Sequence, residues 1–295
     1  MYQFSRGQQL LELCEKYALD IPELTIRSEL EESGENRRRV WEKLAASLKV
    51  MGESVEAGLA GNLRSAGGLA TGNAARLQQW GDQALSGPVI NRASAYALAV
   101  SETNAAMGRI VAAPTAGSSG IVPGVILALQ EELGLSEEMA VNGLLVAGAL
   151  GKIIAANATL SGAEGGCQAE VGSAAAMAAG AAVYMSQGTP QQTLDAGAFA
   201  LKGLLGLVCD PVAGLVEVPC SRRNAIGAAH ALICADLALA GIRSFIPFDE
   251  MVEAMQRVGR QMPHELRETA LGGCAITPSA LAFARQMQED NKTQA

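Results

Sequence analysis

The chain has 295 residues, 49% of them apolar, so it is long enough to bury a sizeable core and too apolar to be intrinsically disordered. Its 22 basic and 30 acidic residues give a formal net charge of −8, which argues against a nucleic-acid-binding protein. Aromatic residues make up only 4%, whereas 33 residues are glycine, so small side chains must do much of the packing.

No secretory signal is expected, because the first ten residues carry Arg6 and lack an apolar stretch. Two apolar segments fall short of a membrane span. Residues 143–160 are interrupted by Lys152 and Asn157, and residues 171–185 are too short and mostly alanine and glycine. We therefore expect a soluble, cytoplasmic protein that does not interact with membranes, in which the six cysteines do not form a disulfide framework.

The predicted fold class is all-α, because strand-like alternation is scarce and helical periodicity is abundant. In chain order, the expected helices are 30–48, 93–108, a helix ending at 132, 137–158, 174–185, 193–207, 224–239 and one that opens at 248–249. Residues 112–240 are expected to form one compact Gly- and Ala-rich core.

Several helix ends can be predicted from single residues. Ser136 and Asp249 are the expected N-caps of the helices that follow them, and Gly241 is the expected glycine after the C-terminus of 224–239. The helical region 30–48 is expected to break near Ser33 and Gly34.

Three glycine-rich loops interrupt these apolar helices with polar residues: 114–124, 157–170 and 209–224. In the first, Ser118, Ser119 and Gly120 precede a helix, where amides and hydroxyls can hold a carboxylate or phosphate, or simply form a turn with a capping serine. The spacing is neither that of a P-loop nor that of a dinucleotide-binding fingerprint.

Cys167, Cys209 and Cys220 lie in the second and third loops, whereas Cys14 and Cys234 lie within predicted helices. Separations of 42 and 11 residues between the three loop cysteines match neither a zinc finger nor a ferredoxin. From spacing alone, a metal site and three buried structural thiols both remain open.

The helix 224–239 carries an apolar stripe at 4-3-4-3 spacing: Ile226, His230, Ile233, Leu237 and Ala240. Cys234 and His230 are adjacent on this helix and are expected to pack in the core. Cys220 directly precedes the predicted helix, where the helix dipole favours a thiolate.

The segments 116–124, 161–170 and 209–220 resemble the iron–sulfur-dependent L-serine dehydratases, specifically the catalytic alpha chain of the two-chain bacterial type, and the resemblance covers about residues 25–285. It implies an all-helical fold and conversion of L-serine to pyruvate and ammonia. It also implies that Cys167, Cys209 and Cys220 hold a [4Fe–4S] cluster, with one iron left open to act as a Lewis acid on the substrate hydroxyl.

Under this resemblance, the substrate carboxylate is expected to bind Ser118, Ser119 and Gly120, and Asn157 and Arg222 are expected to assist. Glu164 is a candidate either for holding the substrate ammonium or for capping a turn.

The candidate catalytic bases are Lys152 and His264. The apolar surroundings of Lys152 would lower its pKa, although the side chain could instead reach solvent or pair with a carboxylate. His264 is a candidate base, positioning group or helix-end contact. Cys274 is either an alternative fourth thiol or a packed loop cysteine.

The one-chain members of the family carry a Ser-Ser-His-Thr segment that helps to form the site, and this sequence lacks it. The resemblance therefore implies a separate beta chain with a small-molecule-binding regulatory domain, an oligomeric enzyme, and little or no activity for this chain alone.

Residues 1–60 are expected to form an N-terminal helical arm or cap, residues 61–285 the catalytic iron–sulfur domain, and residues 286–295 a polar tail that frays. Three alternatives remain open: a threonine deaminase or cysteine desulfidase of the same cluster type, a pyridoxal-phosphate dehydratase using Lys152 and the loop 117–120, and a non-catalytic helical subunit. The pyridoxal-phosphate class needs many strands, which the sequence does not predict.

Overall fold

The computed structural model describes residues 1–294, with side chains described as far as residue 290. Within this range it contains thirteen α-helices and no β-strand, so the predicted all-α fold class is confirmed. The only extended pairing within it is an isolated parallel bridge between Cys209 and Arg267.

The helices up to the glycine-rich loop region are α1 (Gly7–Tyr17), α2 (Ile21–Ser33), α3 (Arg37–Leu59), α4 (Asn73–Gln79), α5 (Pro88–Ala105) and α6 (Ile121–Glu132). The later helices are α7 (Glu137–Asn157), α8 (Gly162–Gly165), α9 (Ser173–Met185), α10 (Pro190–Gly203), α11 (Cys220–Leu239), α12 (Phe248–Gln261) and α13 (Pro278–Gln294). A short π-helix, η2 (Gln168–Gly172), leads into α9.

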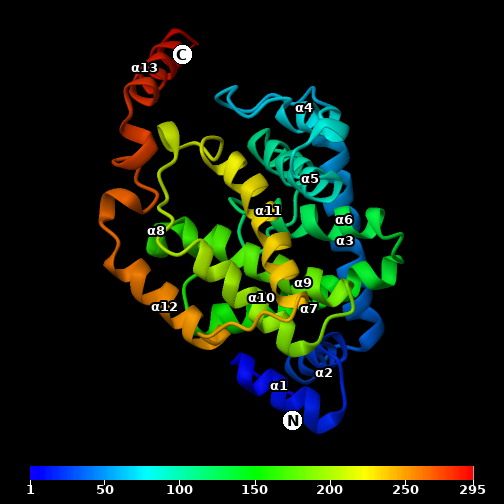
Figure 1. The fold of residues 1–295 in the computed structure, drawn as a ribbon. Coiled ribbons are helices and arrows are strands. Elements are labelled where there is room, and N and C mark those ends of the chain that lie inside the picture. Colours follow the sequence, from blue (N-terminus) through cyan, green and yellow to red (C-terminus); the bar gives the residue numbers. More distant parts are fainter. Residues whose placement is uncertain (295) are drawn as a thin grey trace.

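The core is built around α9, which packs against α7, α10 and α11 (Figure 1). Apart from Tyr184, every residue of α9 is buried, and most are alanine. A helix that is apolar on all sides belongs in the middle of a protein, and its small side chains let four neighbouring helices come close.

Glycines in two neighbouring segments let the backbones of these segments come into direct contact with the backbone of α5. A Cβ atom on Gly58 of α3 would lie 2.2 Å from the carbonyl oxygen of Ala99, and one on Gly120 would lie 2.2 Å from that of Ala97. The close approach of backbones that the composition predicted is therefore found on two sides of α5.

The ends of several helices follow from local capping. Ser136 accepts a hydrogen bond from the backbone N–H of Met139, which confirms it as the N-cap of α7. Gly34 has a left-handed backbone (φ 68°) and ends α2, so the break predicted near residue 34 is also confirmed. Gly241 adopts φ 86° just after α11, as predicted.

The prediction for Asp249 is wrong. The N-cap of α12 is Pro247, and Asp249 lies in the first turn of that helix. Its carboxylate instead accepts hydrogen bonds from the backbone N–H groups of Gly7 (2.7 Å) and Gln8 (3.1 Å), at the start of α1. Asp249 thus caps a different helix, far away in sequence, because the N-terminal amides of α1 have no cap of their own.

The predicted helix 193–207 begins and ends earlier than expected, as α10 over Pro190–Gly203. Thr189 and Gln192 form a reciprocal capping box at its start, in which each side chain bonds to the backbone of the other residue. This capping box fixes the beginning of α10 one turn before its apolar periodicity becomes visible.

The apolar stripe of α11 faces outward and not into the core. Ile226, Ile233 and Leu237 are 62%, 49% and 37% exposed. The buried face consists mainly of small residues, Gly227, Ala228, Ala231, Ala235 and Ala238, together with Cys234 as predicted. Small residues occupy this face because α11 packs closely against α5 and α9.

By length and composition alone, α7 would suffice to cross a membrane, in contrast to the prediction from its interrupting Lys152 and Asn157. However, 67% of its most apolar window is buried inside the fold. This burial is typical of a core helix, and α7 packs against α9.

The N-terminal helices α1 and α2 lie at one end of the molecule and α13 lies at the other (Figure 1). α2 packs against α7, and α1 contacts α10 and α12. The division into an arm, a catalytic domain and a tail stays a prediction. The tail forms part of α13 up to Gln294, and Ala295 and the side chains of residues 291–294 lie outside the described residues.

Candidate metal centre

The three loop cysteines come from three different elements. Cys167 lies between α8 and η2, Cys209 lies in the loop after α10, and Cys220 is the first residue of α11. All three are buried and free of disulfide bonds.

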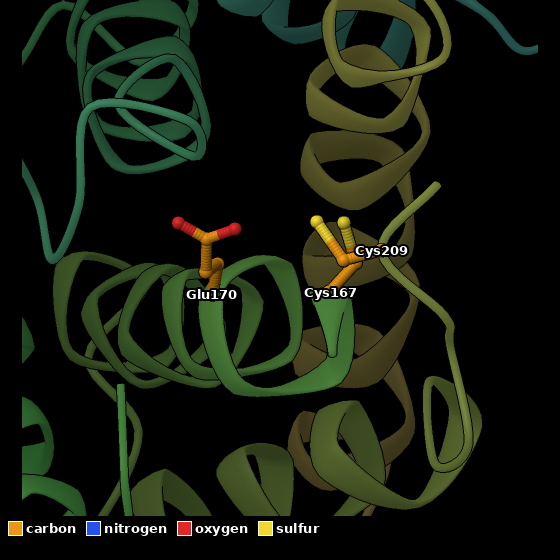
Figure 2. A group of neighbouring side chains, drawn as sticks. All are labelled: Cys167, Glu170 and Cys209. Carbon is orange, nitrogen blue, oxygen red and sulfur yellow. The ribbon is translucent and has the colours of Figure 1, made fainter. Parts of the chain in front are cut away.

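Cys167 and Cys209 lie next to each other and share their surroundings with a carboxylate. The two sulfur atoms and a carboxylate oxygen of Glu170 all lie within 4.8 Å of one another, a grouping that could hold a metal ion. Figure 2 shows the two thiols side by side and the carboxylate of Glu170 pointing to the same side of the helical segment that carries it.

Each of these two cysteines is fixed by backbone hydrogen bonds. The N–H of Cys209 donates to the carbonyl of Leu266 (2.8 Å), and its own carbonyl accepts from the N–H of Glu268 (2.7 Å). Beside Cys167, the N–H of Gln168 donates to the carbonyl of Leu207 (2.9 Å). The loop that ends at Cys209 is thus held by both η2 and the segment 264–268.

Gly162 leaves open the space in front of these groups. A Cβ atom at this position would lie 2.5 Å from Oε2 of Glu170 and 3.2 Å from Sγ of Cys209. The glycine-rich composition of the loop 157–170 is therefore needed here, because any side chain would fill the space that the thiols and the carboxylate face.

Arg223 brings positive charge to the thiols. Its Nη1 lies 3.5 Å from Sγ of Cys167, 2.8 Å from the carbonyl oxygen of Val208 and 2.8 Å from Oδ1 of Asp210. The guanidinium is mostly buried, and Asp210 is almost fully buried. This ion pair ties the first turn of α11 to the loop of Cys209.

These surroundings shift the pKa values of the two neighbouring thiols in opposite directions. A hydrogen bond from Cys209 and the charge of Arg223 lower the pKa of Cys167, in spite of its burial. The same hydrogen bond, with burial, raises the pKa of Cys209. Without a metal, Cys167 is therefore the thiol that ionises first, and Cys209 keeps its proton.

Cys220 lies outside the group of ligand atoms within 4.8 Å, but close enough for the charge of Cys167 to affect it. Burial, and secondly that charge, raise the pKa of Cys220 to about 12. The thiolate that the helix dipole was expected to favour at Cys220 is therefore not stable in the absence of a metal.

Glu170 is the half-buried acid of the site. Its burial raises the pKa of its carboxyl group, and the nearby charge of Glu268 acts in the same direction. Thr115 donates a hydrogen bond to Oε1 (2.7 Å), and Ser118 Oγ lies 3.1 Å from the Thr115 hydroxyl. Two hydroxyl groups of the loop 114–124 are thus linked to Glu170, whose carboxylate lies beside the thiols.

The donors that were expected to hold a substrate carboxylate are engaged within the protein. The hydroxyl of Ser119 donates to the carbonyl of Ala116 (2.8 Å), and the N–H of Gly120 donates to Oδ1 of Asn224 (2.9 Å). Because the Thr115 hydroxyl donates to Glu170, the Ser118 hydroxyl must donate to Thr115. These bonds fix the shape of the loop beside Glu170.

Arg222 lies on the exposed side of the first turn of α11, and its Nη2 donates to the carbonyl of Leu69 (3.0 Å). Glu164 is exposed on α8. Asn157 is at the end of α7, where its Nδ2 donates to the carbonyl of Ser5 (2.7 Å). The partners of Asn157 thus lie in the N-terminal segment and α7, not in the cysteine loops.

The two predicted bases are placed differently. Lys152 pairs with Glu32 of α2 (2.5 Å) and donates to Gln3 and Ser28, so its partners all belong to the N-terminal region. His264 is exposed, but Arg267, three residues later, forms an isolated bridge with Cys209.

His230 and Cys274 have hydrogen-bond partners outside the group of Cys167, Glu170 and Cys209. Nε2 of His230 lies 3.1 Å from the carbonyl oxygen of Ala200. Cys274 is exposed, and its N–H donates to Oδ2 of Asp210 (2.6 Å), so it is not a packed loop cysteine. Whether it serves as a fourth thiol stays a prediction.

Sequence reasoning did not select Glu170, Arg223 or Thr115. Glu170 stood within the quoted motif 161–170, and its position three residues after Cys167 was the available signal, because residues at this spacing share one side of a helix. Arg223 and Arg222 are neighbours on α11, and only the direction of the helix decides which one meets the thiols.

The fold and this site together define an all-helical protein with a candidate metal centre of buried thiols and a carboxylate. A family model described as serine dehydratase alpha chain matches residues 16–275. The chain belongs to this family.

Proteins that are similar to this chain over nearly its whole length have names that match this family. The chain is 48% identical to a probable L-serine dehydratase alpha chain of Bacillus subtilis, over 96% of this chain and 95% of that protein. It is 43% identical to an L-serine dehydratase alpha chain of Peptoniphilus asaccharolyticus, over 96% and 98% of the two chains. An L-serine dehydratase of Streptomyces coelicolor is 39% identical over 93% of this chain, but only 61% of that protein is covered.

Proposed function

We propose that the chain is the catalytic subunit of an L-serine dehydratase, which converts L-serine to pyruvate and ammonia, and that Cys167, Cys209 and Cys220 hold a [4Fe–4S] cluster. The observation that carries the proposal is the group formed by the buried thiols of Cys167 and Cys209 and the half-buried carboxylate of Glu170, in a chain that matches alpha chains of this enzyme over nearly its whole length.

The residues present fit such a cluster. Thiolates are the ligands that iron–sulfur clusters use in most proteins, and the missing side chain of Gly162 leaves space in front of the sulfur atom of Cys209 and the carboxylate of Glu170. Arg223 provides the positive charge that an anionic, thiolate-bound centre needs in a buried place. Three thiolates bind three of the four irons of such a cluster, which would leave one iron without a cysteine ligand.

Elimination of water from L-serine requires loss of the Cα proton and departure of the hydroxyl group. When bound, the cluster supplies a Lewis-acidic iron that stabilises the departing oxygen. The resulting aminoacrylate tautomerises and hydrolyses to pyruvate and ammonia without net oxidation or reduction.

For the proton, we propose Glu170. Its Oε1 is engaged by Thr115, whereas Oε2 faces the space beside Gly162 and Cys209. Burial raises the pKa of its carboxyl group towards the working pH, which suits a group that both takes and returns a proton. His264 stays a second candidate, because its segment lies beside Cys209, whereas Lys152 is held by Glu32.

For the substrate carboxylate, the loop 114–124 stays our proposal, with Ser118, Ser119 and Gly120 shaping it. Arg222 remains the candidate that still has free N–H groups, because only two of its donors are engaged. Glu164 and Asn157 are retained as weaker proposals for binding the substrate.

A beta chain is proposed as partner, in a cytoplasmic oligomer. This chain covers almost all of the related alpha chains but only 61% of the Streptomyces coelicolor protein, so that single polypeptide contains a further region. In the two-chain type we expect that region to come from a separate polypeptide.

The alternatives can be separated by experiment. The all-helical fold of residues 1–294 disfavours a pyridoxal-phosphate dehydratase, which needs a strand-rich fold. L-Threonine and L-cysteine must be assayed beside L-serine, since the elimination is chemically similar. A non-catalytic subunit would form no pyruvate under any condition.

The test is a pyruvate assay with anaerobically purified chain, alone and mixed with the beta chain. We expect slow or no pyruvate formation from L-serine by this chain alone, and turnover in the mixture. Full activity of the chain by itself would contradict the need for a partner, and no activity in a mixture that contains an intact cluster would refute the dehydratase.

A further inference from the structure

The segment that joins α3 to α4 is held by one buried carboxylate, that of Glu217. Oε2 accepts hydrogen bonds from the hydroxyl of Ser65 (2.6 Å) and the backbone N–H groups of Leu69 (2.8 Å) and Ala70 (3.1 Å). Oε1 accepts one from the N–H of Gly67 (2.6 Å). We call residues 60–72 the strap, because they lie across the loop that contains Glu217.

Two further contacts press the strap against the same loop. A Cβ atom on Gly67 would lie 2.8 Å from Cδ1 of Leu215 and 3.0 Å from Cζ of Phe283, so the backbone of the strap is in direct contact with the loop and with α13. Arg222 donates to the carbonyl of Leu69 (3.0 Å) from the first turn of α11.

Glu217 is also part of the start of α11. Its carbonyl oxygen accepts hydrogen bonds from the N–H (3.0 Å) and the hydroxyl (2.7 Å) of Ser221. Glu217 lies three residues before Cys220, the first residue of α11. Its main chain bonds to the first turn of the helix, and its side chain is held by the strap.

Glu217 and the strap stabilise each other. Glu217 is only 2% exposed, and among the described residues it forms no ion pair, so the four donors of the strap are what stabilises its buried charge. In return, the carboxylate orders a segment with three left-handed glycines, Gly61, Gly68 and Gly72. Loss of either partner should release both.

Cys220 has more need of such support than the other two cysteines. Cys209 is paired with the segment 264–268, and the N–H that follows Cys167 bonds to Leu207. Cys220 lies outside the group of ligand atoms within 4.8 Å, so small movements of its loop decide whether it can bind together with the other two.

We propose that Glu217 is a positioning residue, which locks the strap onto the loop between Cys209 and Cys220 and thereby holds Cys220 in place. The lock itself is a property of the metal-free chain. Only its consequence for retaining iron rests on the proposed function.

The test uses the full-length chain with Glu217→Gln, which keeps the size of the side chain and removes its charge. Arg64 lies exposed in the strap and is a cleavage site for trypsin. For the metal-free variant we expect tryptic cleavage after Arg64 and alkylation of Cys220 to rise at least about tenfold, because both report local opening. Cys234, buried in α11, is the internal reference and should not change.

Ser65→Ala is the milder second variant, because it removes one donor to Glu217 and the bond from Ala70 to the Ser65 hydroxyl. It should shift both rates in the same direction by a smaller factor. Glu56→Gln, at an exposed position of α3, is the matched control and should behave as the unmodified chain.

Unchanged cleavage and alkylation in a folded Glu217→Gln chain, with the far-ultraviolet spectrum of the parent, would overturn the proposal. In the iron-loaded enzyme, the variant should lose iron to a chelator faster than the Glu56→Gln control. If the parent chain binds no iron at all, the proposed function fails, whereas the proteolysis and alkylation results still decide the role of Glu217.

Discussion

At the scale of residues, the site depends on two adjacent thiols and on the half-buried cation and half-buried acid beside them. Arg223 and the hydrogen bond from Cys209 lower the pKa of Cys167, and burial raises that of Glu170. These shifts are in the directions that favour a thiolate at Cys167, as the proposed metal site needs, and a protonated carboxyl group at Glu170.

The role of Glu170 gives a direct prediction. Glu170→Gln keeps the hydrogen bond from Thr115 but cannot take a proton, so turnover of L-serine should fall by about 10²–10⁴-fold, the usual contribution of a general base. Iron content should not change, because glutamine removes no thiol. The measurement is kcat for pyruvate formation beside iron per chain.

Two results would speak against this role. Activity within a few-fold of the parent would remove Glu170 from the proton transfer and leave His264 as the remaining candidate near the thiols. Loss of iron from Glu170→Gln would instead make Glu170 a ligand or a support of the metal site.

The sequence predicted residues at this scale only where a motif named them. The resemblance pointed to Cys167, Cys209 and Cys220. No motif pointed to Arg223, because its contact with Cys167 depends on the rotation of α11. The sequence pointed to Lys152 as a base because its neighbours along the chain are apolar. Its ion-pair partner, Glu32, comes from α2, 120 residues earlier in the chain.

At the scale of elements, capping residues and glycines determine where helices begin and how closely they cross. Ser136 and Gly34 could be predicted because each acts on its own helix. Asp249 could not, because its carboxylate caps α1 across the fold. The outward stripe of α11 was missed for a related reason, since apolar periodicity does not tell a large-residue face from a tightly packed small-residue face.

The crossing of α3 and α5 can be tested by one methyl group. Gly58→Ala would place its Cβ 2.2 Å from the carbonyl oxygen of Ala99, so the two helices must separate. We expect the free energy of unfolding to fall by about 1–3 kcal/mol, the usual cost of overpacking. Denaturant unfolding of the metal-free chain measures this change.

The matched control is Gly148→Ala, in the exposed part of α7, where an added Cβ meets nothing within 4 Å. Alanine should stabilise this helix by up to about 1 kcal/mol, because it loses less conformational freedom than glycine. Equal effects of the two substitutions would show that the α3–α5 crossing has room to spare.

At the scale of the whole molecule, helices that are distant in sequence converge on one end of α11. The thiols come from the loop before η2, the loop after α10 and the start of α11. Residues 264–277 bond to Cys209 and Asp210, and residues 60–72 bond to Glu217 in the loop between Cys209 and Cys220. The all-α class followed from the sequence, since periodicity is local. The convergence did not, because no local pattern reports which loops meet.

The proposed cluster depends on the fold of the whole molecule. Residues separated by up to 53 positions must supply three thiolates to one small inorganic core, and the structure brings two of them together with Glu170. Three thiolates are also what would leave one iron free for the substrate.

The most direct test is the content of iron and acid-labile sulfide per chain after anaerobic purification, for the parent chain and for single Cys→Ser variants. We expect about four irons per chain in the parent and in Cys14→Ser and Cys234→Ser, the content of a [4Fe–4S] cluster, and strong loss of iron in Cys167→Ser, Cys209→Ser and Cys220→Ser. Equal iron content in Cys209→Ser and Cys234→Ser would contradict this expectation.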